Sequence, residues 1–194
     1  NAADLQCSVV SGGREIPISD YRHIPQVLDE VYALQPENVL ELGVGFGKWG
    51  VLLREILDAM YGRCRPMLWK RKIWGVEAHE PYRNPCWDCY DGVLIHDFVD
   101  GTLKPGLDLV MMMDSLEHLH PDVGRPFLDS LVLSNKRVII SVPNGYMPQD
   151  QAVYGNEKEK HLWTFNGMEE FERFEGVKLL YQGLCTVVSI PGKA

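Results

Sequence analysis

Three glycines at alternate positions separate a short apolar run from an amphipathic segment, and this arrangement restricts the fold more than any other feature. The stretch 38–50 reads NVLELGVGFGKWG. Its first part, Asn38–Leu42, has the length of a buried strand, and the apolar residues after the glycines recur at helical spacing. Gly43, Gly45 and Gly47 are therefore predicted to join a strand to a helix, where their lack of Cβ atoms would let a ligand approach the backbone.

The same alternation of strand and helix continues along the chain. Strands are predicted at 38–42, 73–76, 93–96, 107–113 and 138–142, and helices around 24–32, 49–60, 81–90 and 126–133. This order produces right-handed crossovers and a parallel sheet covered on both faces. The last two strands, 177–181 and 186–190, are so close in sequence that they can form only an antiparallel hairpin. The expected fold is α/β, a Rossmann-like doubly wound, mostly parallel seven-stranded sheet with an antiparallel C-terminal hairpin.

Composition fits one domain that needs neither disulfides nor metal to fold. The 194 residues are 45% hydrophobic and 24% charged, and the formal net charge of −8 offers nucleic acid no broad basic face. The apolar runs are far shorter than the roughly 20 residues that cross a bilayer, and five scattered cysteines suit a reducing compartment. We expect a single cytoplasmic domain over 1–194 with an N-terminal extension at 1–18, without membrane or nucleic-acid partners. The sequence leaves the oligomeric state open, a homodimer included.

An acid beside the glycines favours a ligand with positive charge. Gly45, Gly47 and Gly50 also have the G-x-G-x-x-G spacing of dinucleotide sites. A dinucleotide would place its pyrophosphate at the helix N-terminus, where N–H groups favour anions, and the carboxylate of Glu41 would repel it. A ligand with a cationic group there would be stabilised instead. An NAD(P)-dependent oxidoreductase remains the alternative enzyme.

The run from Glu41 to Gly47, ELGVGFG, resembles the E/D-x-G-x-G-x-G signature of class I S-adenosylmethionine-dependent methyltransferases. The ligand of that family carries an ammonium and a sulfonium group and no phosphate, in agreement with the acid. The resemblance implies that Glu41, Gly43, Gly45 and Gly47 bind S-adenosylmethionine and, after transfer, S-adenosylhomocysteine. Bare glycine amides would face the amino-acid and ribose parts, and Glu41 would face the ammonium group.

Further segments resemble the same family in the expected order. Glu77 ends the second predicted strand, like the family acid that accepts hydrogen bonds from both ribose hydroxyls, and Ala78 follows it. Asp97 and Phe98 are similar to residues that contact the adenine amino group and ring. The run 107–119, LDLVMMMDSLEHL, is similar to the fourth strand and the EHL run of small-molecule methyltransferases. Its three methionines are predicted to be strand core.

The resemblance places the reaction site around the end of that fourth strand. Asp114 would contact the cofactor and, with Glu117, His118 and His120, border the reacting atoms. Asp114, His118 and His120 are the candidate catalytic residues, although a base is needed only if the acceptor must lose a proton. The alternative for each histidine is a local hydrogen-bonding or solvent-facing role.

The connection 143–163, PNGYMPQDQAVYGNEKEKHLW, leaves the fifth strand without a steady apolar period. Connections longer than about 12 to 15 residues without structure of their own tend to be lids or binding loops. We expect this segment to be a mobile lid, with Tyr146 and His161 as acceptor contacts. A surface loop without a role is the alternative.

The spacing of Cys86 and Cys89 raises the question of a zinc site, with His79 and His96 nearby in sequence. A structural zinc site usually needs a second ligand pair, and the remaining cysteines are isolated. The two cysteines are expected to be buried small residues on one face of a short helix, a redox pair being the alternative. No metal is expected in the chain.

Together these features predict an enzyme that transfers a methyl group from S-adenosylmethionine to a small or medium-sized acceptor, at an O, N or C atom that the sequence does not specify. Two alternatives remain at this stage. One is the NAD(P)-dependent oxidoreductase, and the other is a catalytically inactive cofactor-binding module that serves in interactions. The expected partner of the enzyme is a small-molecule acceptor.

Overall fold

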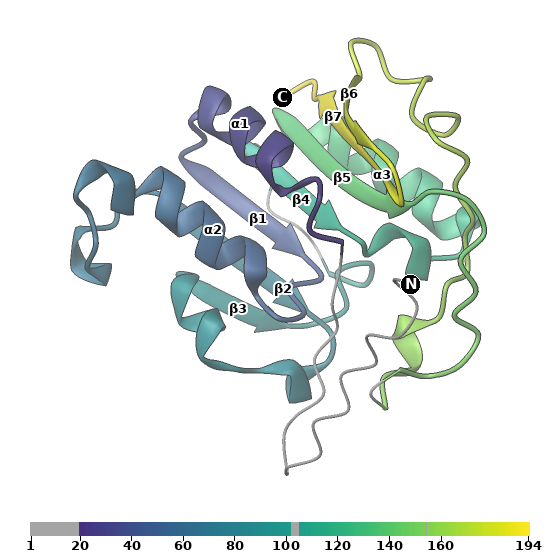
Figure 1. The fold of residues 1–194 in the computed structure, drawn as a ribbon, viewed down its shortest axis with the longest axis horizontal. Helices are drawn as coiled ribbons and strands as arrows, with labels where there is room; N and C mark the ends of the chain where they lie inside the picture. Colours follow the sequence, from purple (N-terminus) through teal and green to yellow (C-terminus); the bar gives the residue numbers. More distant parts are fainter. Residues whose placement is uncertain (1–19, 102–104, 154) are drawn as a thin grey trace.

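The computed structural model describes residues 20–101, 105–153 and 155–194, so the extension predicted at 1–18 lies outside the described residues. Within them a seven-stranded sheet has the order β3-β2-β1-β4-β5-β7-β6 (Figure 1). The strands are β1 (Asn38–Leu42), β2 (Lys72–Glu77), β3 (Gly92–Ile95), β4 (Leu109–Met113), β5 (Arg137–Pro143), β6 (Lys178–Gln182) and β7 (Cys185–Pro191).

The strand order places a topological switch point between β1 and β4. Strands β1 to β5 are parallel to one another, whereas β7 is antiparallel to both β5 and β6. The chain winds from β1 outward to β3, then returns to β4 and winds the other way. In open α/β sheets, ligands bind beyond the carboxyl ends of the strands at such a reversal. The predicted seven-stranded sheet and its closing hairpin are confirmed.

Alternate residues of each strand face opposite helical layers. Val39 and Met111 pack under one layer, and Leu40 and Met112 under the other, all of them buried. The predicted core role of the methionine run is thus confirmed. Figure 1 shows the first two helices on the near face of the sheet and the third on the far face: α1 (Ile24–Leu34), α2 (Lys48–Leu57) and α3 (Pro121–Ser134). Among the described residues, no helix has the length and apolar character to cross a bilayer.

The helix predicted over 81–90 is wrong. Two short 3₁₀ turns, Glu80–Tyr82 and Pro85–Cys89, take its place. A proline stands near the start of each turn and has no N–H for a helical hydrogen bond, and the residue before Pro85 is extended, with φ −150° and ψ 172°. The expected burial of Cys86 and Cys89 is also wrong, because both are free and only half-buried.

The predicted start of the third helix is wrong as well. α3 begins at Pro121, one turn and more before Pro126, which lies inside the helix. Pro121 has the fixed φ that suits a first turn, whereas Pro126 has no N–H to continue the hydrogen-bond ladder. The buried side chains of Leu128, Leu131 and Val132 hold the helix on the sheet and offset that missing bond.

Candidate functional site

A cavity of about 650 Å³ opens at the carboxyl ends of β1, β2 and β4, where the strand order reverses. Most residues predicted to bind cofactor or acceptor line it: Glu41, Gly43, Gly45, Glu77, Ala78, Asp97, Phe98, Asp114, Glu117, His118, His120 and His161. Two predicted residues are not part of its wall. Gly47 is the N-cap of α2, and Tyr146 is 76% exposed.

The amides of the glycine turn are already bound within the protein. The N–H groups of Gly43 and Gly47 donate to backbone carbonyls at 2.9 and 2.8 Å, and that of Gly45 donates to the Glu77 carboxylate at 2.8 Å. The prediction that bare amides face the ligand is therefore wrong. What the turn presents to the cavity is the Glu77 carboxylate, which the Gly45 N–H holds in place.

The glycines are required by conformation and by close packing. Gly43 and Gly47 have φ of 81° and 85°, in the left-handed region that favours glycine. A Cβ atom on Gly43 would lie 2.2 Å from the Ser115 hydroxyl oxygen, and one on Gly47 would lie 2.9 Å from the Trp87 ring. The turn thus brings the segment after β4 and the 3₁₀ turns after β2 against one short piece of backbone.

Glu41 is an acid whose burial favours the protonated form. Its side chain is 1% exposed, and the Tyr90 hydroxyl donates to it at 2.5 Å while accepting from the Gly50 N–H. Burial raises the pKa of Glu41 to about 8, against the opposing effects of Tyr90 and Lys48. A cationic group in the cavity would favour the ionised form and lower this pKa.

Glu77 is held by two backbone amides and still has capacity to accept hydrogen bonds. One carboxylate oxygen accepts from the Gly45 N–H and the other from the His79 N–H, both at 2.8 Å. Burial raises its pKa, and the two amides oppose that effect. Each carboxylate oxygen can accept two hydrogen bonds, so each can accept one more from a ligand.

Asp97 is tied to the long connection after β5. The Lys158 ammonium forms an ion pair with its carboxylate, and the Val99 N–H donates to it at 3.1 Å. Burial acts to raise the pKa of Asp97, but Lys158 and Val99 outweigh burial and the pKa is lowered. Phe98 packs beside Phe127, with ring centroids 5.6 Å apart. Lys158 is a cavity residue that the sequence did not indicate.

Asp114 adopts a strained backbone at the end of β4. Its φ of 57° lies in the left-handed region, which costs a non-glycine residue of order 1 kcal/mol or more. The Ser141 hydroxyl donates to its carboxylate at 2.5 Å. This neighbouring-strand contact holds the side chain at the cavity wall, as the resemblance implied.

Glu117 and His118 lie in a 3₁₀ turn, Leu116–His118, directly after that strand end. Glu117 is 1% exposed, and burial raises its pKa well above the usual range. Its backbone carbonyl accepts from the N–H groups of Leu162 and Trp163 at 2.8 and 3.1 Å. Burial lowers the pKa of His118, against the opposing charge of Glu159, and favours the neutral ring.

His120 lies at the rim of the cavity and caps a helix. Its side chain is 62% exposed, and Nδ1 accepts from the Asp122 N–H at 3.4 Å at the start of α3. These contacts fit the alternative that His120 has a local hydrogen-bonding role, and they fit a role as a catalytic base less well.

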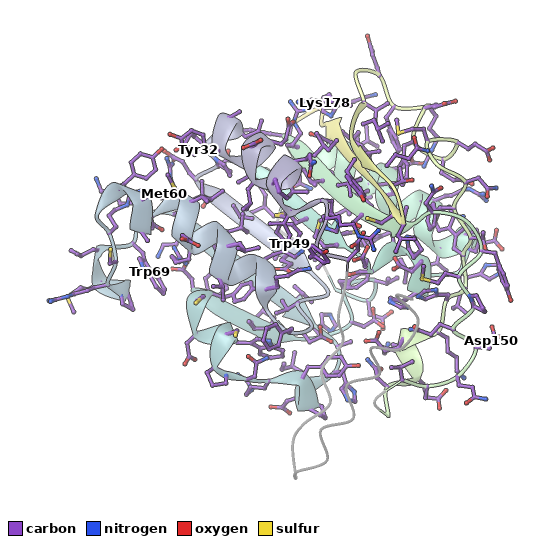
Figure 2. All side chains as sticks on the ribbon, in the orientation of Figure 1. Tyr32, Trp49, Met60, Trp69, Asp150 and Lys178 are labelled. Carbon is purple, nitrogen blue, oxygen red and sulfur yellow. The ribbon has the colours of Figure 1, made fainter. Side chains whose placement is uncertain are left out.

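Several residues of the connection 143–163 line the cavity, and its role as a mobile lid remains a prediction. Figure 1 shows it leaving β5, running past the carboxyl end of the sheet and returning toward β6. Glu159 accepts from the Tyr82 hydroxyl at 2.9 Å, and His161 lies with its Nδ1 2.7 Å from the Met147 carbonyl oxygen. Asp150 projects outward from its far edge (Figure 2). Of the two predicted acceptor contacts, only His161 lines the cavity; the choice of Tyr146 is wrong.

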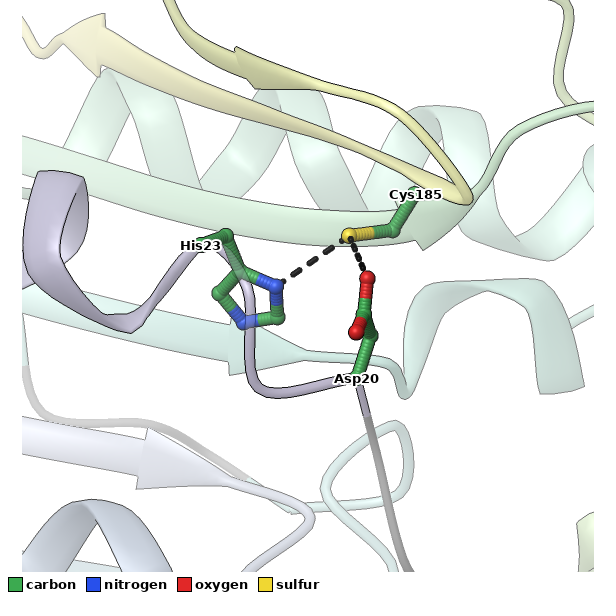
Figure 3. A group of neighbouring side chains, drawn as sticks. All are labelled: Asp20, His23 and Cys185. Atoms are coloured by element: carbon green, nitrogen blue, oxygen red, sulfur yellow. Dashed lines mark hydrogen bonds between the residues drawn. The ribbon is translucent and has the colours of Figure 1, made fainter. Parts of the chain in front are cut away.

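A polar cluster behind the cavity wall escaped the sequence analysis. Cys185 Sγ lies 3.1 Å from His23 Nδ1 and 3.9 Å from an Asp20 carboxylate oxygen (Figure 3). The His23 ring stacks on Trp49, which lines the cavity. Burial raises the pKa of Cys185 to about 12, so the thiol stays protonated. Residues so distant in sequence form no motif that could have revealed the cluster.

No protein-family model and no curated protein sequence matches this chain. Solved structures do match in fold. The DhpI–SAH complex has a TM-score of 0.59 and 16% identity, over 88% of this chain and 85% of that one. PigF with SAH has a TM-score of 0.55 and 14% identity, over 81% of this chain and 51% of that one.

A third match is the mitomycin 7-O-methyltransferase MmcR, with a TM-score of 0.56 and 14% identity over 88% of this chain and 53% of that one. The chain thus spans about half the length of PigF and of MmcR. At these identities the likeness concerns the fold. The chain has the Rossmann-like methyltransferase fold that the order of its strands and its final hairpin predicted.

Proposed function

We propose that the protein transfers a methyl group from S-adenosylmethionine to a small or medium-sized acceptor. One observation carries the proposal: two buried acids, Glu41 and Glu77, border one cavity at the switch point of a methyltransferase-like fold. Such a pair suits a ligand with one ammonium group and neighbouring ribose hydroxyls, and suits a phosphate poorly. The presence of SAH in the PigF and DhpI structures supports the same cofactor.

The glycine turn argues against the dinucleotide alternative. A pyrophosphate needs free N–H groups at the start of the helix. In this chain the Gly45 N–H is held by the Glu77 carboxylate, and Gly43 and Gly47 are bonded to carbonyls. A phosphate would have to displace a buried carboxylate and then lie beside it. The residues present therefore fit S-adenosylmethionine and do not fit NAD(P).

The proposed binding roles follow from the carboxylates and other hydrogen-bond acceptors that line the cavity. Glu41 would pair with the ammonium group, Glu77 would accept from the ribose hydroxyls, and Asp97 with Phe98 would border the adenine. S-adenosylmethionine, when bound, supplies an electrophilic methyl group on sulfur. The protein then has to align the acceptor and exclude water, and segment 143–163 forms that wall with Gln149, Val153 and residues 156–162.

The proposed partner is a small-molecule acceptor, and the proposed location is the cytoplasm, without nucleic-acid or membrane partners. The net charge of −8 and the free cysteines support these proposals. A catalytically inactive cofactor-binding module would have the same cavity, and it would bind the cofactor without transferring the methyl group.

Calorimetry with S-adenosylhomocysteine and with NAD tests the cofactor. Binding of the first and not the second is expected, and the reverse would refute the proposal. Incubation with S-adenosylmethionine and a panel of hydroxyl-, amine- and carbon-acid-containing metabolites then tests transfer. Formation of S-adenosylhomocysteine that depends on one acceptor is expected; cofactor binding without any such product would favour the inactive module.

A further inference from the structure

Three side chains in the acceptor half of the cavity bring one carboxyl group and two imidazoles together. They are Glu117 and His118, after β4, and His161, on segment 143–163. One ligand-type atom from each lies within 4.8 Å of the other two. The two imidazole rings have centroids 5.2 Å apart. Two segments that are distant in sequence thus contribute to one set of nitrogen and oxygen donors.

The hydrogen bonds of the two histidines leave the second nitrogen of each ring with a lone pair. His118 Nδ1 lies 3.1 Å from the Lys160 carbonyl oxygen, and His161 Nδ1 lies 2.7 Å from that of Met147. A carbonyl oxygen only accepts, so each Nδ1 carries the proton and each Nε2 is a potential ligand. Metal-binding histidines usually donate their other N–H in this way, which fixes the tautomer and the ring.

The environment of Glu117 is a second, independent observation that points to a ligand at this position. It is 1% exposed, and its Oε2 is buried without a hydrogen-bond partner among the described residues. A buried polar atom left without a hydrogen-bond partner destabilises the folded state. Glu159 adds negative charge, with one oxygen 3.8 Å from His118 Nε2. A cation between these groups would satisfy the carboxylate.

We propose that Glu117, His118 and His161 bind a first-row divalent cation such as Mn²⁺, Co²⁺ or Zn²⁺. Two imidazoles and one carboxylate suit these ions, whereas Mg²⁺ prefers oxygen ligands alone. Three protein ligands leave further coordination positions open, as in catalytic metal sites. The sequence-based expectation of no metal is replaced by this site.

The open positions would take hydroxyl oxygens of the acceptor, a step that rests on the proposed function. A cation lowers the pKa of a bound hydroxyl, whose proton passes to solvent water. The oxygen electron pair then forms the bond to the methyl carbon, while the carbon–sulfur bonding pair returns to sulfur. The site therefore favours an acceptor with a hydroxyl group and requires no side-chain base.

Ion binding would need a small movement of segment 143–163 only where the donor spacing exceeds that of bound ligands. Metal–ligand bonds of about 2 Å place two donors on one ion about 3 to 3.5 Å apart, and the three donor atoms lie within 4.8 Å of one another. His161 lies on the connecting segment and not on the sheet, so this residue can make the movement. The ion would thus fix the cover of the cavity as well as the acceptor.

The test is calorimetry of the chelator-treated protein with Mn²⁺, Co²⁺ and Zn²⁺. One ion per chain is expected. His161→Gln and Glu117→Gln should weaken binding by at least about 10- to 100-fold. His120→Gln, at the rim of the same cavity, and His23→Gln, in the Asp20–His23–Cys185 cluster, should leave it unchanged. His161→Gln lies outside the sheet, so its folding, checked by circular dichroism, is expected to match that of the parent.

Three results would overturn the proposal. The first is no binding of any of the three ions, and the second is equal affinity of the His161→Gln variant. The third is a thiolate-to-metal charge-transfer band in the Co²⁺ spectrum, which would locate the ion at a cysteine and not at Glu117, His118 and His161. S-adenosylhomocysteine affinity measured in chelator separates the two claims: loss of that binding with ion binding intact would refute the proposed function and leave the metal site standing.

Discussion

Glu41→Gln is expected to stabilise the protein at neutral pH while it weakens cofactor binding. Burial raises the pKa of Glu41 from its ordinary 4.5 to about 8, despite the hydrogen bond from Tyr90. Between these two values the folded protein keeps a proton that the unfolded chain has released. The free energy of unfolding therefore falls as the pH rises through this window, by about 1.4 kcal/mol per pH unit.

At pH 7, which is 2.5 units above the ordinary pKa, the acid costs the folded state about 3 kcal/mol. Glutamine cannot ionise, and its amide oxygen can still accept from the Tyr90 hydroxyl. The variant should therefore lack this cost. The gain should be small near pH 5, grow to about 3 kcal/mol at pH 7 and stay constant above pH 8.

Urea unfolding of the parent and the variant at pH 5, 6, 7 and 8 measures this difference. Glu55→Gln is the matched control, since Glu55 lies exposed on α2 and should give two parallel profiles. S-adenosylhomocysteine should bind the Glu41→Gln variant less tightly, because the ammonium group loses its counter-charge. Stability profiles that stay parallel for Glu41→Gln would show that this carboxyl is not a protonated buried acid.

Other outcomes follow from the same geometry. Glu77→Ala should weaken S-adenosylhomocysteine at least about tenfold in calorimetry, since hydrogen bonds to a charged acceptor contribute about 1.5 to 3 kcal/mol each; unchanged affinity would remove Glu77 from the site. Limited proteolysis should cut the empty protein between Tyr146 and Lys160 and be slowed by cofactor with acceptor; resistance of the empty protein would refute a mobile lid. The Cys86→Ser, Cys89→Ser double variant should fold normally in chelator by circular dichroism; a requirement for metal would contradict this.

The position of the acids at the strand ends could be predicted from the sequence. The acid before the glycines and the acid at the end of β2 could be assigned because parallel strands bring their carboxyl ends to one edge of the sheet. The resemblance to the methyltransferase family indicated Asp97 and the run from Asp114 to His118, and Asp97, Asp114, Glu117 and His118 line the cavity. These residues lie within five positions of a strand end, so their place depends mainly on the sheet.

What the sequence did not show depends on contacts between distant segments. The glycine amides looked free, but the Glu77 carboxylate, 32 residues further on, binds one of them. The ion pair of Lys158 with Asp97 joins positions 61 residues apart. Tyr146 and His161 belong to one irregular segment without a period of its own, and only the folded path separates the exposed ring from the cavity residue.

Segment 143–163 connects the two halves of the cavity through two adjacent residues. Lys158 pairs with Asp97 on the adenine side, and Glu159 contacts both Tyr82 and His118, between the cofactor and acceptor sides. In the proposed complex, an adenine amino group bound to the Asp97 carboxylate would compete with Lys158 for it, and an ion at His161 would fix the same segment on the acceptor side. Both proposed ligands would therefore act on segment 143–163, and its position would depend on which of them is bound.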